Sequence, residues 1–366
     1  MEFILSILIV FYAYVGYGIL ISLIVKLKVF NAKKTGDKEF LPSVSLIIPC
    51  FNEVDYIEQK VKNSLNILYP KEKLEIIFIA DGSDDGTEKV LQKFSEIKVM
   101  FEPERRGKAS AMNRAVKVAK GEIIIFCDAN TDLNPEAIKE LVKHYESEQV
   151  GAVTGEKQIL IRNSDGTSTA GEGLYWKYES YLKRKDSELW SVAGAAGELM
   201  SYRKSLYTSL EPDTLLDDFM QSMRVAVRNY RVIYEPKAIA TETASANIKE
   251  ELKRKIRIGA GGWQSISRLF FEVSPFKNFR LFFIYYSHRV LRWTLAPFAL
   301  FLLIPFNILI VNQSPVYQLS LIALITFFLL ALAGRVLEKQ KIKIFFIPFY
   351  FVMMNYAIIA GFWRFI

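Results

Sequence analysis

Three long stretches without a charged residue restrict the fold of this 366-residue chain more than any other feature. They cover residues 3–25, 293–334 and 344–363. A helix rises about 1.5 Å per residue, so roughly 20 apolar residues cross a hydrocarbon core of about 30 Å. The second stretch is about twice that length and is broken by Asn312–Pro315. The sequence therefore predicts four membrane-spanning helices.

Basic residues beside these stretches predict how the chain is oriented, because Lys and Arg are enriched in short cytoplasmic flanks. The flanks on one side carry Lys26, Lys28, Lys33, Lys34, Arg289, Arg292, Arg335, Lys339, Lys341 and Lys343, whereas the turn at Asn312 carries none. We therefore expect a multi-pass protein of the cell membrane, with its polar middle and active site in the cytoplasm and both termini outside. The first stretch lacks the basic start and cleavage site of a signal peptide, so it is expected to be a retained anchor.

The composition agrees with a protein of mixed character. With 51% hydrophobic and 23% charged residues, the chain is too apolar for an ordinary soluble enzyme and too polar for a protein wholly inside lipid. Much of the net charge of +8 sits at the membrane flanks. Anionic lipid is the expected partner there, and nucleic-acid binding is not expected.

The polar middle alternates short β-rich runs with helical patterns. This alternation predicts an α/β fold with a mostly parallel, Rossmann-like sheet and helices on both faces. Ligands of such sheets bind at the carboxyl ends of the strands. The expected strands are 44–48, 76–80, 99–101, 123–127 and 152–154, and the expected helices are 55–68, 87–94, 108–120 and 135–148.

Acidic and polar residues follow these expected strand ends. Asp81 directly ends a buried strand, which places it to reach the ribose or base of a nucleotide. Asp128 and Asn130 put two oxygen-bearing side chains on the same side of an extended backbone. That arrangement suits a hard divalent cation that bridges a diphosphate. Pro49–Glu53 begins at another strand end and is a further candidate.

A basic turn, Arg105–Lys108, precedes a helix of small residues. Backbone amides, the helix dipole and cationic side chains can converge on a phosphate at such a place. A solvated basic turn is the alternative interpretation.

The segment Thr214–Phe219 predicts a further helix start. Thr214 and Asp217 are spaced as a capping box, in which both serve only the helix end. Asp218 has no such role. If its carboxylate faces the ligand cleft at the strand ends, it can accept a proton from a hydroxyl nucleophile. Alternatively, Asp218 only stabilises the helix terminus through the dipole, by about 0.3–1 kcal/mol.

Residues 251–290 are expected to form interfacial amphipathic helices, with aromatic rings in lipid and charges toward headgroups. Lys253–Arg257 leads into an expected glycine-rich turn, Gly259–Gly262. Two interpretations remain open. Either the cluster is a lipid-surface patch, or Arg254 and Arg257 point inward to a diphosphate leaving group.

Seven signals, taken in order, resemble the family 2 glycosyltransferases. The resemblance is to the membrane-integrated branch that contains cellulose, chitin, hyaluronan and poly-N-acetylglucosamine synthases, and it covers about residues 40–275. The signals are Pro49–Glu53, Asp81–Thr87, Gly107–Lys108 with Asn113, Asp128–Asn130, Gly194–Gly197, Asp217–Asp218 and Arg254–Ile258. The resemblance implies a GT-A fold. The expected organisation is an anchor in 1–30, a cytoplasmic glycosyltransferase domain in 40–250, interfacial helices in 251–290 and three transmembrane helices in 291–366.

The resemblance also implies an inverting, metal-dependent transfer from a nucleotide-sugar, usually UDP-linked, to a hydroxyl acceptor, with Mg²⁺ or Mn²⁺ as cofactor. Asp218 matches the general base. The matching nucleotide and diphosphate contacts are Pro49, Asn52, Glu53, Asp81, Lys108, Asp128, Arg254 and Arg257, and the metal ligands are Asp128 and Asn130. The matching acceptor-side residues are Gly194, Ala195, Gly197 and Glu198, with Tyr202, Arg203 and Asp217.

Two positions depart from the family pattern. Asn130 stands where a second acid is common, and Ile258 stands where processive synthases carry a tryptophan that holds the terminal sugar. Three functions therefore stay open: synthesis of a β-linked polysaccharide or glycan, transfer of one sugar to a lipid acceptor such as polyprenyl phosphate, and a catalytically silent sugar-nucleotide-binding assembly subunit. Four membrane spans make a narrow scaffold for a channel that passes a polymer. A homo-oligomer or an accessory subunit can supply the further helices that such a channel needs.

Overall fold

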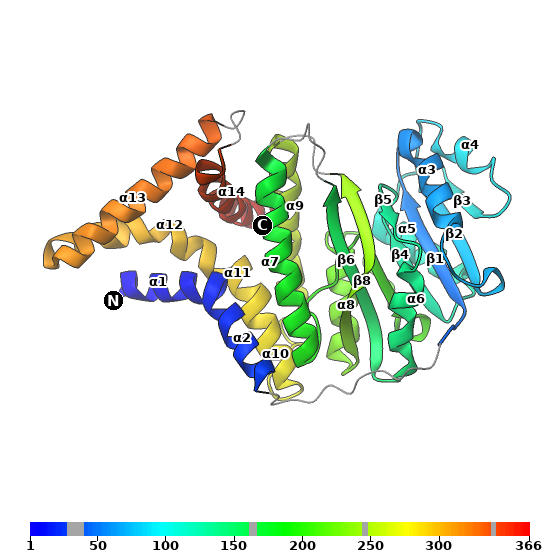
Figure 1. The fold of residues 1–366 in the computed structure, drawn as a ribbon, viewed down its shortest axis with the longest axis horizontal. Coiled ribbons are helices and arrows are strands. Elements are labelled where there is room, and N and C mark those ends of the chain that lie inside the picture. Colours follow the sequence, from blue (N-terminus) through cyan, green and yellow to red (C-terminus); the bar gives the residue numbers. More distant parts are fainter. Residues whose placement is uncertain (28–39, 161–166, 244–247, 338–341) are drawn as a thin grey trace.

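The computed structural model describes residues 1–27, 40–160, 167–243, 248–337 and 342–366. A sheet domain lies at one end and a group of apolar helices at the other (Figure 1). The long helices α7 (Thr167–Leu189) and α9 (Ile248–Leu269) stand between them. Part of the predicted orientation rests on Lys28, Lys33, Lys34, Lys339 and Lys341, which lie outside the described residues.

The sheet has eight strands in the order β3-β2-β1-β4-β7-β6-β8-β5. Parallel pairings join β1 to β2 and β4, β2 to β3, and β6 to β8, whereas β7 runs antiparallel to β4 and β6 and β5 runs antiparallel to β8. The α/β class is confirmed, and the sheet is more mixed than predicted. The strands are β1 (Val44–Cys50), β2 (Leu74–Asp81), β3 (Lys98–Glu102), β4 (Ile123–Cys127), β5 (Thr131–Leu133), β6 (Val150–Leu160), β7 (Leu199–Arg203) and β8 (Arg231–Thr243).

Helices cover both faces of the sheet because its central strands are apolar on both sides. On β1, Leu46 and Ile48 enter one core while Ile47 enters the other. The first core includes α3 (Val54–Leu65) and α6 (Ala137–Val142), and the second includes α5 (Lys108–Val118), α8 (Asp217–Val227) and α10 (Phe279–Tyr285). The short helix α4 (Thr87–Leu91) lies between β2 and β3 in the chain.

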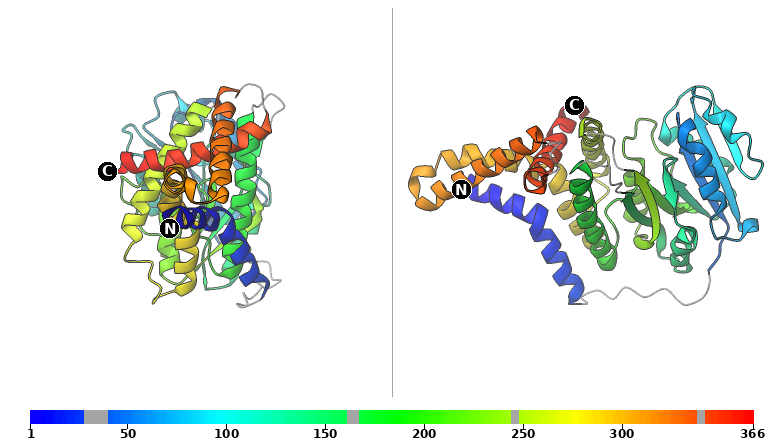
Figure 2. Two further views of the ribbon diagram at one scale, coloured as in Figure 1. Left: turned by 90° about the vertical axis from the view of Figure 1, so that its left-hand side faces the viewer. Right: turned by 45° about the horizontal axis from the view of Figure 1, so that its top comes forward.

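Three helical segments are long and apolar enough to cross a membrane. They are Glu2–Lys26, Pro315–Val336 and Ile344–Phe365. The first consists of α1 (Glu2–Phe11), a π-helical turn and α2 (Tyr17–Lys26), and the others are α13 (Pro315–Val336) and most of α14 (Lys343–Phe365). Figure 2 shows these helices on the side of the molecule away from the sheet.

The predicted second span is shorter than expected, since α12 (Leu295–Ile308) has only 14 residues. It adds a fourth span if it continues the segment Phe279–Trp293, to which it is joined at a 48° bend. Pro297 has no N–H to donate to the carbonyl of Trp293, so the helical hydrogen-bond ladder is interrupted at the bend. The predicted break before α13 is confirmed: Ser314 caps that helix, and Pro315 begins it.

The glycines Gly259–Gly262 lie inside α9, so the predicted glycine-rich turn there is wrong. A Cβ on Gly259 would lie 2.9 Å from the carbonyl oxygen of Ala357, and one on Gly262 would lie 2.8 Å from the Trp293 ring. These glycines therefore allow α9 to approach α14 and the Trp293 ring closely. Small residues serve the same purpose at other helix contacts in membranes.

Gly361→Ala is expected to lower the thermal stability of the protein in detergent. The new Cβ would lie 2.5 Å from the backbone nitrogen of Ala260, so α9 and α14 must separate. Overpacking of this kind costs about 1–3 kcal/mol. The matched control is Gly173→Ala in α7, whose Cβ meets no described atom within 4 Å. Equal melting temperatures for the two variants would contradict the close contact.

Candidate active site

One polar cavity of about 380 Å³ lies where the sheet meets α7 and α9. Eight separate parts of the chain bring charged or polar side chains to it. These residues are Lys108, Asp128, Asn130, Tyr175, Trp176, Glu179, Lys183, Glu198, Asp217, Asp218, Glu242, Arg254, Lys255, Arg257, Arg289 and Trp293. Carboxylates more than a hundred positions apart along the chain therefore share one cavity.

Most of the predicted site residues line this cavity, together with Ala195 and Gly197 of the predicted acceptor loop. Seven predicted residues do not line it: Pro49, Asn52, Glu53, Asp81, Gly194, Tyr202 and Arg203. The Arg203 guanidinium instead donates to the carbonyls of Tyr145, Ser147 and Val150. Tyr202 is fully buried in β7.

Lys108 lies between two carboxylates at the start of α5. Its Nζ is 2.8 Å from Asp128 Oδ1 and 3.4 Å from Asp217 Oδ2. Burial disfavours the charge of this ammonium, but the two carboxylates outweigh burial and hold the pKa of Lys108 well above its usual value. Asp217 Oδ2 is buried and has no hydrogen-bond donor among the described residues. The Lys108 ammonium is thus shared between two carboxylates in the cavity.

Asp218 is the second residue of α8 and faces the predicted acceptor loop. A Cβ on Gly197 would lie 3.2 Å from Asp218 Oδ2, so the loop backbone passes close to the carboxylate. Burial, together with the charge of Asp217, raises the pKa of Asp218 to about 7, although Lys108 partly offsets the rise. A carboxyl group with a pKa near neutrality is suited to accept a proton at neutral pH.

The predicted capping box before α8 is wrong. The helix begins at Asp217 after Leu216, and no side chain caps it. The Thr214 hydroxyl instead accepts from Arg268 Nη1 at 2.9 Å. Asp217 is consequently not engaged by Thr214 and stays beside Lys108.

Asp81 has protein partners for both carboxylate oxygens. Oδ2 accepts from the backbone N–H groups of Arg106 at 2.9 Å and Gly107 at 2.7 Å, and Oδ1 contacts the Arg114 guanidinium. Asp81 therefore fixes the turn that leads into Lys108. Its role as a nucleotide contact stays a prediction.

The predicted contacts Asn52 and Glu53 link two loops at the sheet edge. Asn52 Nδ2 donates to Asp84 Oδ1 at 2.8 Å, and the Glu53 N–H donates to Thr87 Oγ1 at 2.9 Å. Burial and the charge of Asp128 raise the pKa of Glu53. The nucleotide-binding roles of Pro49, Asn52 and Glu53 stay predictions.

Glu198 belongs to a buried ion-pair cluster. Lys157 Nζ lies 2.5 Å from Glu198 Oε1 and also contacts Glu242. Burial alone would raise the pKa of Glu198, but the Lys157 ammonium outweighs it and lowers the pKa to about 2. The acceptor loop is further held by its backbone, since the Ala195 N–H donates to Ser222 Oγ at 3.0 Å.

Lys157→Met is expected to destabilise the fold by about 3–5 kcal/mol, because it leaves buried carboxylates without their cation. The Lys157 side chain is only 2% exposed. Chemical unfolding in detergent measures the change. Lys62→Met is the control, since that lysine is 62% exposed in its pair with Glu58 and should change stability by no more than about 1 kcal/mol. Equal losses in the two variants would refute the assigned role of burial.

Arg254 and Arg257 both line the cavity from α9. This placement favours the interpretation in which they point inward over the lipid-surface patch. Arg254 Nε also donates to Glu251 Oε2 at 2.8 Å, which fixes the start of its side chain. Their contact with a diphosphate stays a prediction.

The sequence analysis missed the contribution of α7. Trp176, Glu179 and Lys183 line the cavity, and their spacing of three and four residues places them on one helix face. Ionisable and aromatic residues at that spacing were the signal available in the sequence. Trp293 was also missed, and it packs on Phe219 with the ring centroids 5.0 Å apart. The indoles of Trp176 and Trp293 thus line the same cavity as Ile258, which stands where processive synthases carry a tryptophan.

A divalent cation fits the cavity only together with further oxygen ligands. No group of three or more His, Cys, Asp or Glu side chains suited to a metal occurs among the described residues. Asp128 and Asn130 lie in a turn, closed by the Thr131 N–H to the Asp128 carbonyl at 3.4 Å, so the predicted extended backbone is wrong. Both still line the cavity. One carboxylate and one amide suit a cation that takes its other ligands from a substrate phosphate, as Mg²⁺ commonly does.

Comparisons with known proteins agree with this geometry. Residues 45–210 match the model of "Glycosyl transferase family 2". Residues 45–210 thus form a family 2 glycosyltransferase domain, and the chain has a GT-A fold. Its relatives in sequence include poly-beta-1,6-N-acetyl-D-glucosamine synthases.

The sequence relatives include the poly-beta-1,6-N-acetyl-D-glucosamine synthase of Staphylococcus aureus, with 29% identity over 271 residues, or 71% of this chain and 64% of that protein. The enzyme of the same name from Staphylococcus epidermidis is 26% identical over 67% of this chain and 60% of its own length. The chain thus spans less than two thirds of the length of these relatives.

A similar solved structure is the mannosyltransferase from Pyrobaculum calidifontis in complex with GDP-Man and Mn²⁺. The TM-score is 0.78 over 100% of this chain and 99% of that one, at 22% identity. The likeness shows a common fold that includes the membrane-side helices.

Proposed function

We propose that this protein transfers a sugar, with inversion, from a nucleotide-sugar to a hydroxyl acceptor at the cytoplasmic face of the membrane. The observation that carries the proposal is the convergence of Asp128, Lys108 and Asp218 on one cavity with Arg254 and Arg257. The cationic side chains in the cavity suit a diphosphate leaving group, and a carboxyl group with a pKa near 7 suits a base. UDP is the proposed nucleotide, on the resemblance to the synthase branch.

The proposed reaction is a single in-line displacement. Asp218 takes the proton of the acceptor hydroxyl, whose oxygen forms a bond to the anomeric carbon. The bond from that carbon to the diphosphate breaks, and the nucleoside diphosphate leaves with the electron pair. An α-linked donor thus gives a β-linked product. Lys108, Arg254 and Arg257 would hold the diphosphate, and a cation held by Asp128 and Asn130, Mg²⁺ or Mn²⁺, would supply charge neutralisation there.

A growing β-linked glycan is the proposed acceptor, because the relatives are named for polymer synthesis. A second cavity of about 480 Å³ supports an acceptor route. It shares Tyr175, Arg289, Trp293, Met354 and Ile358 with the catalytic cavity. It continues between the membrane helices, where Tyr14 and Phe351 line it.

The same adjoining cavity also favours a second candidate, the transfer of one sugar to a lipid phosphate. Arg289 and Arg292 line it beside aromatic rings, which suits an anionic group on an apolar chain. Incubating the purified protein with a panel of radiolabelled UDP- and GDP-sugars, Mn²⁺ or Mg²⁺, and lipid acceptors tests both. A ladder of products supports glycan extension, and a single lipid-soluble product supports lipid glycosylation. Absence of transfer with every donor would refute the proposed function.

The transfer rate is expected to rise with pH through an apparent pKa near 7, because only ionised Asp218 accepts the proton. Stability should change in the opposite direction. The folded-state pKa lies above the ordinary value of 3.8, so the folded state retains a proton that the unfolded chain releases, and stability falls as pH rises through that interval. Transfer rates and melting temperatures across this pH range measure both. A flat rate profile would contradict Asp218 as the base.

A further inference from the structure

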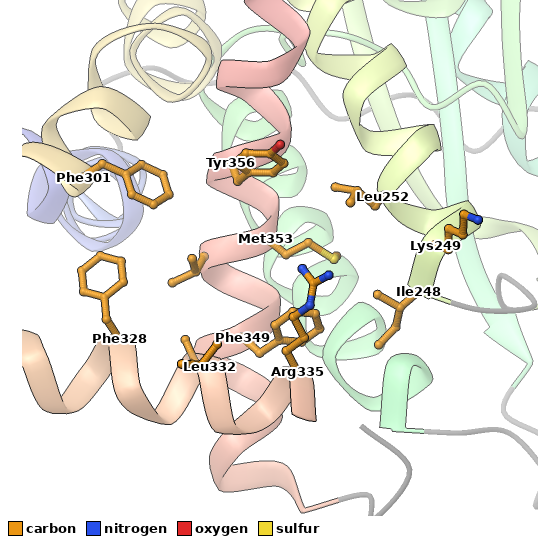
Figure 3. A pocket seen from close by; sticks show the side chains of 12 residues that line it. Ile248, Lys249, Leu252, Phe301, Phe328, Leu332, Arg335, Phe349, Met353 and Tyr356 are labelled. Carbon is orange, nitrogen blue, oxygen red and sulfur yellow. The ribbon is translucent and has the colours of Figure 1, made fainter. Parts of the chain in front are cut away.

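A separate and larger cavity, of about 790 Å³, lies among the membrane-side helices (Figure 3). Its walls come from α9, α12, α13 and α14, and most of them are apolar. Phe301 and Phe328 form one end with their ring centroids 6.0 Å apart. The volume falls within the range of about 300–1,000 Å³ that ligand sites have.

Two cations interrupt this apolar lining. Arg335 comes from the last turn of α13 and Lys249 from the first turn of α9. Figure 3 shows the Arg335 guanidinium extending toward Met353, with Ile248 and Lys249 on the neighbouring helix. An apolar wall with positive charge on one side suits a ligand that is both apolar and anionic.

Neither cation is neutralised within the part of the chain that the structure describes. No acidic residue lines the cavity there, and no ion pair joins Arg335 or Lys249 to a described carboxylate. The two glutamates that follow Lys249 are engaged elsewhere, since Glu250 lies 3.0 Å from Lys253 and Glu251 lies 2.8 Å from Arg254. Both side chains are exposed at helix ends, where an unpaired positive charge beside an apolar span can meet an anionic headgroup.

We propose that this cavity binds an anionic glycerophospholipid. Its phosphate lies against Arg335 and Lys249, and one acyl chain lies along Phe301, Phe328 and Phe349. The position of α13 favours a lipid over a soluble ligand, because only 6% of its apolar span is buried by the rest of the chain. Positive charge close to a membrane surface attracts anionic headgroups.

The lipid would also act on the catalytic cavity through α9. Lys249 and Leu252 line the lipid cavity, and Arg254 and Arg257 line the catalytic cavity a short distance along the same helix. A lipid held between α9 and α13 would therefore hold the proposed diphosphate contacts in place. Arg335 and Lys249 act as positioning residues in this arrangement, since neither lines the catalytic cavity.

Native mass spectrometry of the full chain in detergent tests the proposal by counting bound lipid. The probes are phosphatidylglycerol, phosphatidylcholine with the same acyl chains, and inorganic phosphate. We expect phosphatidylglycerol to be retained about ten-fold more than phosphatidylcholine, as one lost charge-assisted contact predicts. Arg335→Gln should remove most of that difference. Arg364→Gln is the matched control. Arg364 is an exposed arginine at the C-terminal end of α14, and it lines neither the lipid cavity nor the catalytic cavity.

Leu332→Trp provides a second variant that keeps both charges. Leu332 is 59% exposed and lines the cavity, so an indole there should occupy the acyl-chain space without upsetting a packed core. Retention of phosphatidylglycerol should fall in this variant too. Equal retention of both lipids, or unchanged retention in both variants, would overturn the proposal. Displacement of the lipid by inorganic phosphate at equal concentration would also overturn it, in favour of a free-phosphate site.

Discussion

Asp218→Asn should lower the rate of sugar transfer by about 10²–10⁴-fold, the contribution that a positioned general base makes. The amide has nearly the same shape as the carboxylate but cannot accept the proton. Donor affinity should change little, because Lys108, Arg254 and Arg257 remain. Single-turnover transfer of a radiolabelled sugar measures the rate, and calorimetry with the nucleoside diphosphate measures binding separately.

Asp55→Asn is the matched control for this prediction. Asp55 is an exposed acid in the first turn of α3, as Asp218 is an acid in the first turn of α8, but it does not line the cavity. If the helix dipole were the only role of Asp218, both variants should lose a similar small amount of stability and no activity. If the Asp218→Asn variant still transfers sugar at the normal rate, Asp218 is not the general base. Nucleotide binding without transfer in the unchanged protein would support the silent assembly subunit.

The convergence of the site was predictable because it follows from the sheet. β1, β2 and β4 are parallel neighbours, so their carboxyl ends lie at one edge. Asp128 follows β4, and the turn before Lys108 is held by Asp81 at the end of β2. Short apolar, β-rich runs identify these strands, and the parallel arrangement then brings their ends together.

The features that failed depend on partners far along the chain. Thr214 and Asp217 have the spacing of a capping box, but Arg268 takes the Thr214 hydroxyl from 54 positions away. Four residues with three glycines predict a turn, yet Gly259–Gly262 stay helical because α14 packs against them. Local preference is a weak determinant where tertiary packing offers a competing arrangement.

Strand β7, in the middle of the sheet, was not predicted from the sequence for a related reason. β7 pairs with β4 and β6 in antiparallel register, so its place comes from strands that are distant in sequence. Its residues Leu199–Arg203 give too short a pattern to identify alone. Likewise, α7 contributes Trp176 and Lys183 to the cavity, but no strand end or motif marks that helix.

Asp128→Asn is expected to weaken nucleoside diphosphate binding roughly 10–100-fold in the presence of Mn²⁺, because a charged cation ligand is lost. Asp132→Asn is the control. Asp132 lies four residues further along, accepts from Tyr56 at 3.0 Å and Gln59 at 2.7 Å, and does not line the cavity. Calorimetric titration of each variant with the nucleoside diphosphate, with Mn²⁺ and then with chelator, measures the effect.

The result in chelator separates the two roles that Asp128 can have. In the structure its Oδ1 lies 2.8 Å from Lys108 Nζ. If the carboxylate serves a cation, its removal should be harmless in chelator and can even tighten binding, since Lys108 is released toward the diphosphate and a negative charge beside the phosphates is gone. If Asp128 serves only to position Lys108, affinity should fall equally with and without Mn²⁺. Equal loss in both conditions would therefore refute the metal site and leave Asp128 as a structural partner of Lys108.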